Sequence, residues 1–353
     1  MMHKQIHFRR RFIWKITTLV VGAFLWIVSI INQMYISDYH TAVSVRYHEP
    51  VITRQQIDII LEDMISREDN YIPEITLWQR EENIDITNEG KGNSMKISLI
   101  TVAGDMSKIY PVSMLYGGYL TAEDKMGCVI DRATAYRLYG NPNVVGMKSC
   151  IHNKEYIIRG VIDEIDSNVM IIQEEEGPYK SLDDKKYSCL EMSYTDTENA
   201  KLLAERFITT NGLGTPDTYI DGYQNQKLSY MLIHIPLWFS ALYILIYASR
   251  KVYSLNASPV LTLIGIVGLI LLSIILIKLT NMYIYYPSSM IPNKWSDFDF
   301  FISKLKLIIF SLSRKEGMAQ YYKDIILRKR MLMVIIGVVA AIITELYLVK
   351  KCN

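Results

Sequence analysis

Four long apolar stretches, separated by polar segments of very unequal length, constrain this chain more than any other feature. Each is long enough to cross the hydrocarbon core of a bilayer, which takes about 20 residues of helix. Half of all residues are hydrophobic, a share that does not suit an ordinary soluble domain when the apolar residues gather in this way. The sequence predicts about four transmembrane helices, over residues 13–31, 231–248, 260–277 and 331–349.

Basic residues before the first apolar stretch indicate the orientation of the chain. No small-x-small cleavage pattern follows the stretch, which favours an uncleaved signal anchor over a cleaved signal peptide. Because positive charge collects on the cytoplasmic side of membrane helices, we expect the N-terminus in the cytoplasm and the polar segment after the first helix outside. The second apolar stretch then returns to Arg250 and Lys251 on the cytoplasmic side. The basic flank consists of Lys4, Arg9, Arg10, Arg11 and Lys15.

The segment before the last apolar stretch fits this topology less well. Four spans put residues 281–330 outside, yet the segment ends in the basic run Arg328–Lys329–Arg330. One alternative is that residues 300–313 enter the membrane and bring the basic run inside. Their apolar side chains instead fall on one helical face, which suits a helix lying in the membrane interface. We favour four spans with both termini inside.

These patterns divide the chain into five parts. Residues 1–36 form a cytoplasmic tail and the first membrane helix, and residues 37–228 form a large external domain. Residues 229–280 hold the second and third membrane helices, residues 281–330 connect them to the rest, and residues 331–353 hold the fourth helix and the C-terminal tail. The expected location is the cell membrane, with several spans.

The external domain is predicted to be α+β. A strand–helix–strand unit opens it, with Thr53 as a likely N-cap of a helix over 53–69, and a second such unit closes it over 188–223. The second helix is expected to begin at a cap on Thr197 and to stop at Gly212. Strands and turns fill the middle, residues 90–175. The fold class is therefore an α-helical membrane protein with a large α+β extracytoplasmic domain.

One short stretch, YGNPNVVGMKSC at 139–150, imitates a phosphate-binding loop. Five residues rather than four separate Gly140 from Gly146, and Met147 displaces Lys148 from its place after the second glycine. The flanks are also reversed, because a helix is predicted before the stretch and a strand after it. The stretch is therefore not expected to bind nucleotide phosphate.

The same stretch lies in a longer run that resembles the periplasmic core domain of MacB-type ABC transporter permeases, the family that includes FtsX and the lipoprotein-releasing permeases. The resemblance covers about fifty residues, and the order of one span, a large external domain and then the remaining spans supports it. It implies that Gly140 and Gly146 are turn residues and that Lys148 is a surface lysine. The matching positions are Gly118, Asp124, the strand 128–131, Ala135, Leu138–Tyr139–Gly140, Val144–Val145–Gly146 and Arg159–Gly160–Val161.

The resemblance implies a driven membrane protein without an ATPase of its own. A separate cytoplasmic ATPase would supply the energy, two permease subunits would act together as a homodimer or heterodimer, and motion would pass along the first two spans to the external domain. Family members carry a charged coupling segment between spans two and three. This chain has only SRKVYSLNASP there, so Arg250 and Lys251 are the candidate coupling residues, with the basic stretch 313–330 as the alternative.

Two classes of function remain open. The first is a permease or mechanotransmission subunit that moves or extracts a hydrophobic or peptide-like substrate at the outer face, either as a complete permease or as an accessory subunit. The second is an FtsX-like regulator, which does not transport and whose external domain binds a cell-envelope partner. The reduced coupling segment favours the second class more than family membership alone would, and we keep the permease or mechanotransmission subunit as the first hypothesis. The expected partners are the ATPase, a second permease subunit and the lipid bilayer.

The sequence gives little indication of metal, cofactor or nucleic-acid sites. The histidines show no metal-ligand spacing, the acidic residues of 163–176 suit a solvated face, and no cofactor is expected. The basic segments lie beside membrane spans without interleaved aromatic residues, so no nucleic-acid contact is expected. Cys128 and Cys150 fall on neighbouring predicted strands, which leaves a disulfide between them open.

Some residues within the spans are also notable. Glu345 and His234 lie near span ends, where their side chains can reach the interface, and we favour this over a transport relay. Small residues suit close helix packing, within one subunit or between two: Gly265, Gly268, Gly337, Ala340 and Ala341.

Overall fold

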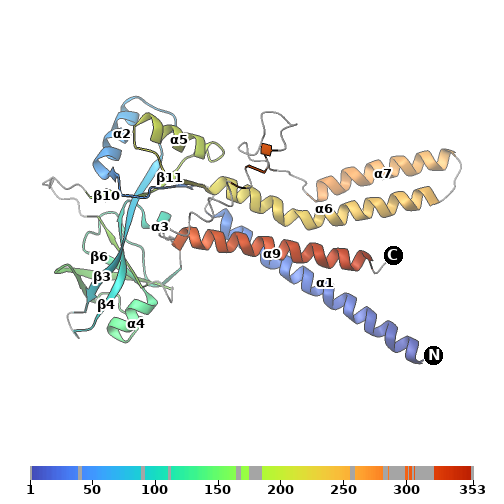
Figure 1. Ribbon diagram of the computed structural model, residues 1–353, viewed down its shortest axis with the longest axis horizontal. Coiled ribbons are helices and arrows are strands. Elements are labelled where there is room, and N and C mark those ends of the chain that lie inside the picture. Colours follow the sequence, from blue (N-terminus) through green and yellow to red (C-terminus); the bar gives the residue numbers. More distant parts are fainter. Residues whose placement is uncertain are drawn as a thin grey trace. The chain divides into compact units, whose positions relative to one another are not determined.

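The structure is a computed structural model, and it describes residues 2–38, 42–88, 92–109, 113–163, 168–174, 185–254, 259–280, 285, 299–300, 302–303, 306 and 322–350. The chain divides into two compact units. One consists of Thr41–Tyr223, and the other combines Met1–His40 with Gln224–Asn353. We describe each unit by itself (Figure 1).

Among its described residues, the second of these units contains four helices that are long and apolar enough to cross a membrane. Within these residues, the four helices confirm the four predicted spans. The helix expected over 300–313 lies almost entirely outside the described residues. The four helices are α1 (Met2–Ser37), α6 (Gly222–Ser254), α7 (Pro259–Leu279) and α9 (Tyr322–Lys350).

Helices α1 and α9 pack side by side and run antiparallel (Figure 1). Near the end of α1 that leads into the α+β domain, Arg330 donates a 3.0 Å hydrogen bond to Asn32 and lies 4.3 Å over the ring of Tyr35. Towards the other end, Gly22 of α1 packs against Thr344 of α9. Residues 328–330 therefore lie at the end of α1 that continues into the domain, as four spans require.

The α+β domain is built on one ten-stranded sheet. The order is β12-β1-β11-β3-β4-β9-β6-β8-β5, with β7 pairing β3 and β8. Only β4–β9 and β6–β8 are parallel among its pairs. The strands are β1 (Ala42–Arg46), β3 (Glu74–Thr87), β4 (Ser94–Ala103), β5 (Met114–Gly117), β6 (Gly127–Asp131), β7 (Lys148–Ile151), β8 (Lys154–Ile162), β9 (Val169–Gln173), β11 (Cys189–Ser193) and β12 (Thr218–Asp221).

Two hydrophobic cores lie along this sheet. The first is formed where α2 (Arg54–Ser66) and α5 (Ala200–Thr210) cover β1, β11 and the start of β3. The second is formed where α4 (Arg132–Tyr139) covers β4, β6, β8 and β9. Strand β3 runs through both cores, with Leu77 in the first and Ile86 in the second. The short elements β2 (Ile52–Thr53), α3 (Met106–Ile109) and β10 (Lys186–Tyr187) complete the domain.

Capping residues explain where α2 and α4 begin. Thr53 and Gln56 form the capping box of α2, which confirms the predicted cap. Asp131 caps α4, and its carboxylate accepts hydrogen bonds from the backbone N–H groups of Ala133 and Thr134. The expected cap on Thr197 is wrong. Helix α5 begins at Ala200 instead, and the residue at its cap position, Asn199, makes no side-chain capping hydrogen bond.

Helix α6 also begins earlier than predicted. The apolar pattern places the start of the span at residue 231, whereas the helix begins at Gly222, immediately after β12. Its first nine residues, GYQNQKLSY, are mostly polar and therefore lack the hydrophobic signal of a membrane span. The helix thus continues without a loop from the sheet into the apolar segment.

Candidate functional site

The most informative part of the domain is the pair of strands that joins it to the membrane helices. Strand β1 follows α1, and β12 runs directly into α6. These two strands pair with each other, antiparallel, in a register from Val43 opposite Asp221 to Arg46 opposite Thr218. They form one edge of the sheet. Two transmembrane helices that are far apart in the sequence therefore connect to adjacent, hydrogen-bonded strands.

The helices themselves are also joined close to these strands. Gln226 in the first turns of α6 donates a 2.6 Å hydrogen bond to the hydroxyl of Ser37, the last residue of α1. Further along, the indole N–H of Trp26 donates to the carbonyl of Ile233 at 2.8 Å. Pro236 lies inside α6 and removes one backbone donor from this part of the helix. Helices α1 and α6 are therefore joined by hydrogen bonds, as the strands β1 and β12 that adjoin them are.

Strand β1 is held on its other side by a buried polar cluster. The guanidinium of Arg46 lies 2.8 Å from the carboxylate of Glu191 on β11, and their side chains are 4% and 0% exposed. The hydroxyl of Ser44 and the indole N–H of Trp78 on β3 also donate to this carboxylate, the latter at 3.2 Å. The cluster ties β1, β11 and β3 together through charges that are costly to separate once buried.

Three of the residues singled out by the family resemblance, Gly118, Asp124 and Gly160, lie at the opposite edge of the sheet, where β5 pairs with β8. A Cβ added to Gly160 would lie 2.5 Å from the carbonyl oxygen of Gly118, so the backbones are close enough there to exclude a side chain. Asp124 forms a 2.7 Å ion pair with Arg159 in the same place. The neighbouring Gly117, which the sequence did not single out, has a φ of +71° and approaches the backbone of residue 159 closely.

Gly140 and Gly146 are turn residues, as the resemblance implied. Gly140 ends α4 with a φ of +76°, and its N–H donates to the carbonyl of Tyr136. Gly146 has a φ of +87° and hydrogen-bonds to β8 through its N–H. Lys148 is exposed at the surface, where it pairs with Glu155. Helix α4 before this stretch and strand β7 after it confirm that the order of elements is not that of a phosphate-binding loop.

The candidate coupling residues lie at the far end of α6 from β12. Arg250 and Lys251 are both exposed, in the last turns of the helix. Helix α7 begins at Pro259, and residues 255–258 between the two helices lie outside the described part of the chain. The structure therefore separates the two groups of candidate residues, with the motif residues in the domain and the coupling residues at the end of a membrane helix.

The cysteines do not form the disulfide that the sequence left open. Strands β6 and β7 pair with β8 and not with each other, so Cys128 and Cys150 belong to strands separated by a third. Strand spacing puts such residues about 10 Å apart, beyond the reach of a disulfide. Both thiols are free. Burial raises the pKa of the Cys128 thiol well above its ordinary value, which keeps it protonated and unreactive.

Potential metal ligands do not cluster in the part of the chain that the structure describes. No group of three histidine, cysteine, aspartate or glutamate side chains converges there. Within the acidic stretch, Asp163 pairs with Arg132 at 2.9 Å and Glu174 with Arg54 at 3.6 Å.

Known proteins resemble this chain in structure but not in sequence. No protein-family model and no curated protein matches it. It is similar to the periplasmic region of MacB from Actinobacillus actinomycetemcomitans, at 13% identity and a TM-score of 0.41, over 53% of this chain and 92% of that one. It is also similar to the extracellular domain of the ABC-type transporter YknZ from Gram-positive bacteria, at 13% identity and a TM-score of 0.38, over 50% and 97%. A domain of a protein described as a permease, from Porphyromonas gingivalis, matches at 11% identity and a TM-score of 0.33, over 48% and 84%.

The protein itself has four apolar helices of membrane-spanning length and an α+β domain.

Proposed function

We propose that this protein is a permease or mechanotransmission subunit of an ABC-type transporter, driven by a separate cytoplasmic ATPase. Its N-terminus lies in the cytoplasm and its α+β domain outside. It works with a second permease subunit, identical or related, to move or extract a hydrophobic or peptide-like substrate at the outer face of the membrane. The family resemblance of the sequence and the connection between the membrane helices and the sheet support this proposal.

The observation that carries the proposal is the pairing of β1 with β12. A displacement of α1 relative to α6 acts on two adjacent strands at one edge of the sheet, with no loop between β12 and α6 to absorb it. The Ser37–Gln226 hydrogen bond keeps the two helices together just before the strands begin. This arrangement suits a device that passes motion from the membrane to the domain.

The contact with the ATPase is assigned to the end of α6. Arg250 and Lys251 are exposed there, at the opposite end of the helix from β12. A force applied at these residues would be transmitted along a single helix of 33 residues, Gly222–Ser254, which has a length of about 50 Å.

The first test is purification of the full chain from its native membrane in mild detergent, with identification of co-eluting proteins and an assay of ATP hydrolysis. We expect a stoichiometric ATPase that is lost when Arg250→Ala and Lys251→Ala are combined. A matched control combines Lys96→Ala with Lys186→Ala, which removes two exposed positive charges from the α+β domain. Loss of the ATPase in both double variants would show that Arg250 and Lys251 have no special role.

A second test addresses transmission through β12. Insertion of Gly-Gly-Ser between Asp221 and Gly222 makes this junction flexible, whereas the same insertion between His152 and Asn153 lengthens an exposed turn between β7 and β8. In the complex with its ATPase, ATP should change hydrogen exchange of the β1 and β12 amides in the native protein and in the turn variant. The junction variant should lose this response. An unchanged response would overturn the transmission role of the junction.

A second candidate function is an FtsX-like regulator that does not transport. The short connection between α6 and α7, with only residues 255–258 between them, favours it because little chain remains for a coupling segment. Recovery of the protein without any ATPase, under conditions that keep a control transporter intact, would support the regulator and overturn the transporter.

A further inference from the structure

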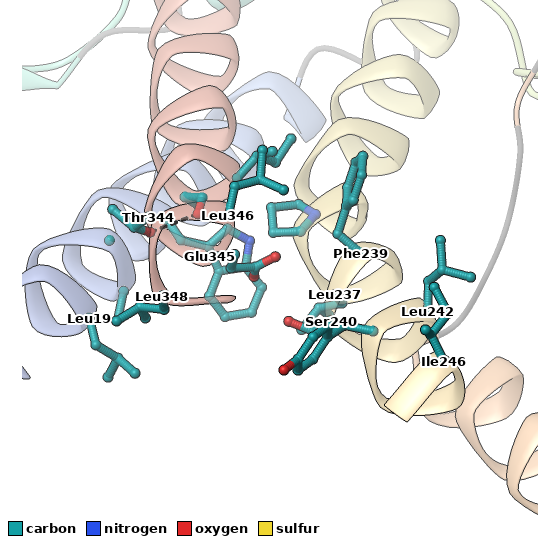
Figure 2. Close-up of a pocket in the computed structure, with 17 residues that line it drawn as sticks. Leu19, Leu237, Phe239, Ser240, Leu242, Ile246, Thr344, Glu345, Leu346 and Leu348 are labelled. Carbon is teal, nitrogen blue, oxygen red and sulfur yellow. Dashed lines mark hydrogen bonds between the residues drawn. The ribbon is translucent and has the colours of Figure 1, made fainter. Parts of the chain in front are cut away.

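A cavity lies among three of the membrane helices, α1, α6 and α9 (Figure 2). Its volume is about 480 Å³, within the range of pockets that bind small molecules. Most of the side chains that line it are apolar, among them Leu19, Phe239 and Leu346. A mostly apolar cavity of this size suits a hydrophobic ligand.

One ionisable side chain, Glu345 of α9, points into the space between α9 and α6 (Figure 2). Ser240 of α6 is a hydrogen-bond partner of its carboxyl group. The Oε2 oxygen of Glu345 is buried and has no hydrogen-bond partner among the described residues. That this side chain reaches the membrane interface stays a prediction; Lys350 at the end of the helix is about 7.5 Å further along the axis.

The other polar groups in the wall are already engaged or are neutral. The Thr344 hydroxyl donates to the carbonyl of Ala341 at 2.7 Å, and the Trp26 indole donates to Ile233. No lysine, arginine or histidine is among the lining residues that the structure describes. A carboxylate in apolar surroundings is costly without a counter-charge, and the wall of the cavity does not supply one.

We propose that this cavity binds a lipophilic organic cation, whose positive charge pairs with Glu345 and whose apolar body fills the remaining space. The aromatic rings of Trp26, Phe239 and Tyr243 line the same cavity and favour a cation over an anion. A phospholipid headgroup fits less well, because its phosphate would need a basic partner that the described wall lacks. This proposal does not rest on the proposed function and applies equally to a transporter or a regulator.

The test uses the full chain in lipid nanodiscs and two probes of nearly equal shape and opposite charge, tetraphenylphosphonium and tetraphenylborate. Equilibrium dialysis against empty nanodiscs separates binding to the protein from partition into lipid. We expect saturable binding of tetraphenylphosphonium at one site per chain. Tetraphenylborate should not compete for this site.

Variants assign the site to the cavity. Glu345→Gln keeps the shape of the side chain and should weaken binding of tetraphenylphosphonium at least tenfold. Glu345→Asp keeps the negative charge and should retain most of the affinity. Asp324→Asn removes one negative charge from the first turn of the same helix and should change the affinity less than twofold. Equal binding by the Glu345→Gln variant, equal competition by tetraphenylborate, or the absence of saturable binding would each overturn the proposal.

Discussion

Gly160 and Gly118 belong to the same sequence motif but differ in the space that each leaves for a side chain. At Gly160 an added Cβ would lie 2.5 Å from a backbone oxygen, whereas at Gly118 it would meet no atom within 4 Å. The motif alone gives both residues the same weight. The close approach of β5 to β8 makes only one of them sterically necessary.

We therefore expect Gly160→Ala to lower the free energy of unfolding of the domain by about 1–3 kcal/mol, as overpacking does. Gly118→Ala is the matched control and should change it by less than about 0.5 kcal/mol. Hydrogen exchange of the β5 and β8 amides in the full chain measures both effects. Equal protection in the two variants would contradict the close contact.

The buried pair of Arg46 and Glu191 leads to a second prediction at this scale. Glu191→Ala leaves a buried guanidinium without its carboxylate, which typically costs about 3–5 kcal/mol. Replacement of the exposed Glu198 by alanine is the control and should change the free energy of unfolding by less than about 0.5 kcal/mol. Hydrogen exchange of β1, β11 and β3 is the measurement, and a similar loss in both variants would show that the pair does not stabilise these strands.

At the scale of elements, small residues decide how the membrane helices approach one another. Gly337 of α9 lies so close to α1 that a Cβ would be 2.6 Å from the carbonyl oxygen of Leu25, and Ala341 is also buried. Gly265 of α7 is close to Val252 of α6, while Gly268 faces open space. The prediction of close packing is thus confirmed for Gly337, Ala341 and Gly265 within one chain, and Gly268 has no such contact.

Gly337→Val should therefore weaken the packing of α1 against α9 and lower the melting temperature of the detergent-solubilised protein by roughly 2–10 °C. Gly268→Val introduces the same side chain without a clash and should leave the melting temperature unchanged. A larger loss in the Gly268→Val variant would show instead that the face of α7 around this glycine is packed, for instance against a second copy.

For the whole molecule, the antiparallel pairing of α1 with α9 bears on the membrane topology. Arg330 is engaged with Asn32 and Tyr35 at the end of α1 that continues into the domain. Arg330, the last residue of the basic run before the last span, is thus held by specific contacts with α1. The four-span topology, in which this run lies on the side that the charge rule disfavours, stays a prediction.

The topology predicts where engineered cysteines can be labelled. With Cys150 and Cys352 replaced by serine, Arg328→Cys should react with a membrane-impermeant maleimide in right-side-out vesicles. Arg250→Cys, which is expected on the opposite side of the membrane, should react only after the vesicles are permeabilised. The reverse pattern would place the α+β domain in the cytoplasm, and labelling of both sites before permeabilisation would exclude four spans.

The sequence by itself determined the number of membrane helices, the α+β class of the domain and most of its elements. It did so because these depend on local patterns: long apolar stretches, strand alternation, and the capping signal at Thr53. Where the local signal was weak, the prediction was wrong. The polar start of α6 and the uncapped start of α5 are the clearest cases.

Only the tertiary structure decided which distant segments meet. The pairing of β1 with β12, the hydrogen bond between Ser37 and Gln226, and the cavity around Glu345 each join residues that are far apart in the sequence. The separation of Cys128 from Cys150 by β8 is a result of the same kind. No local pattern encodes such contacts, because they arise from the order of strands in the sheet and from the packing of whole helices.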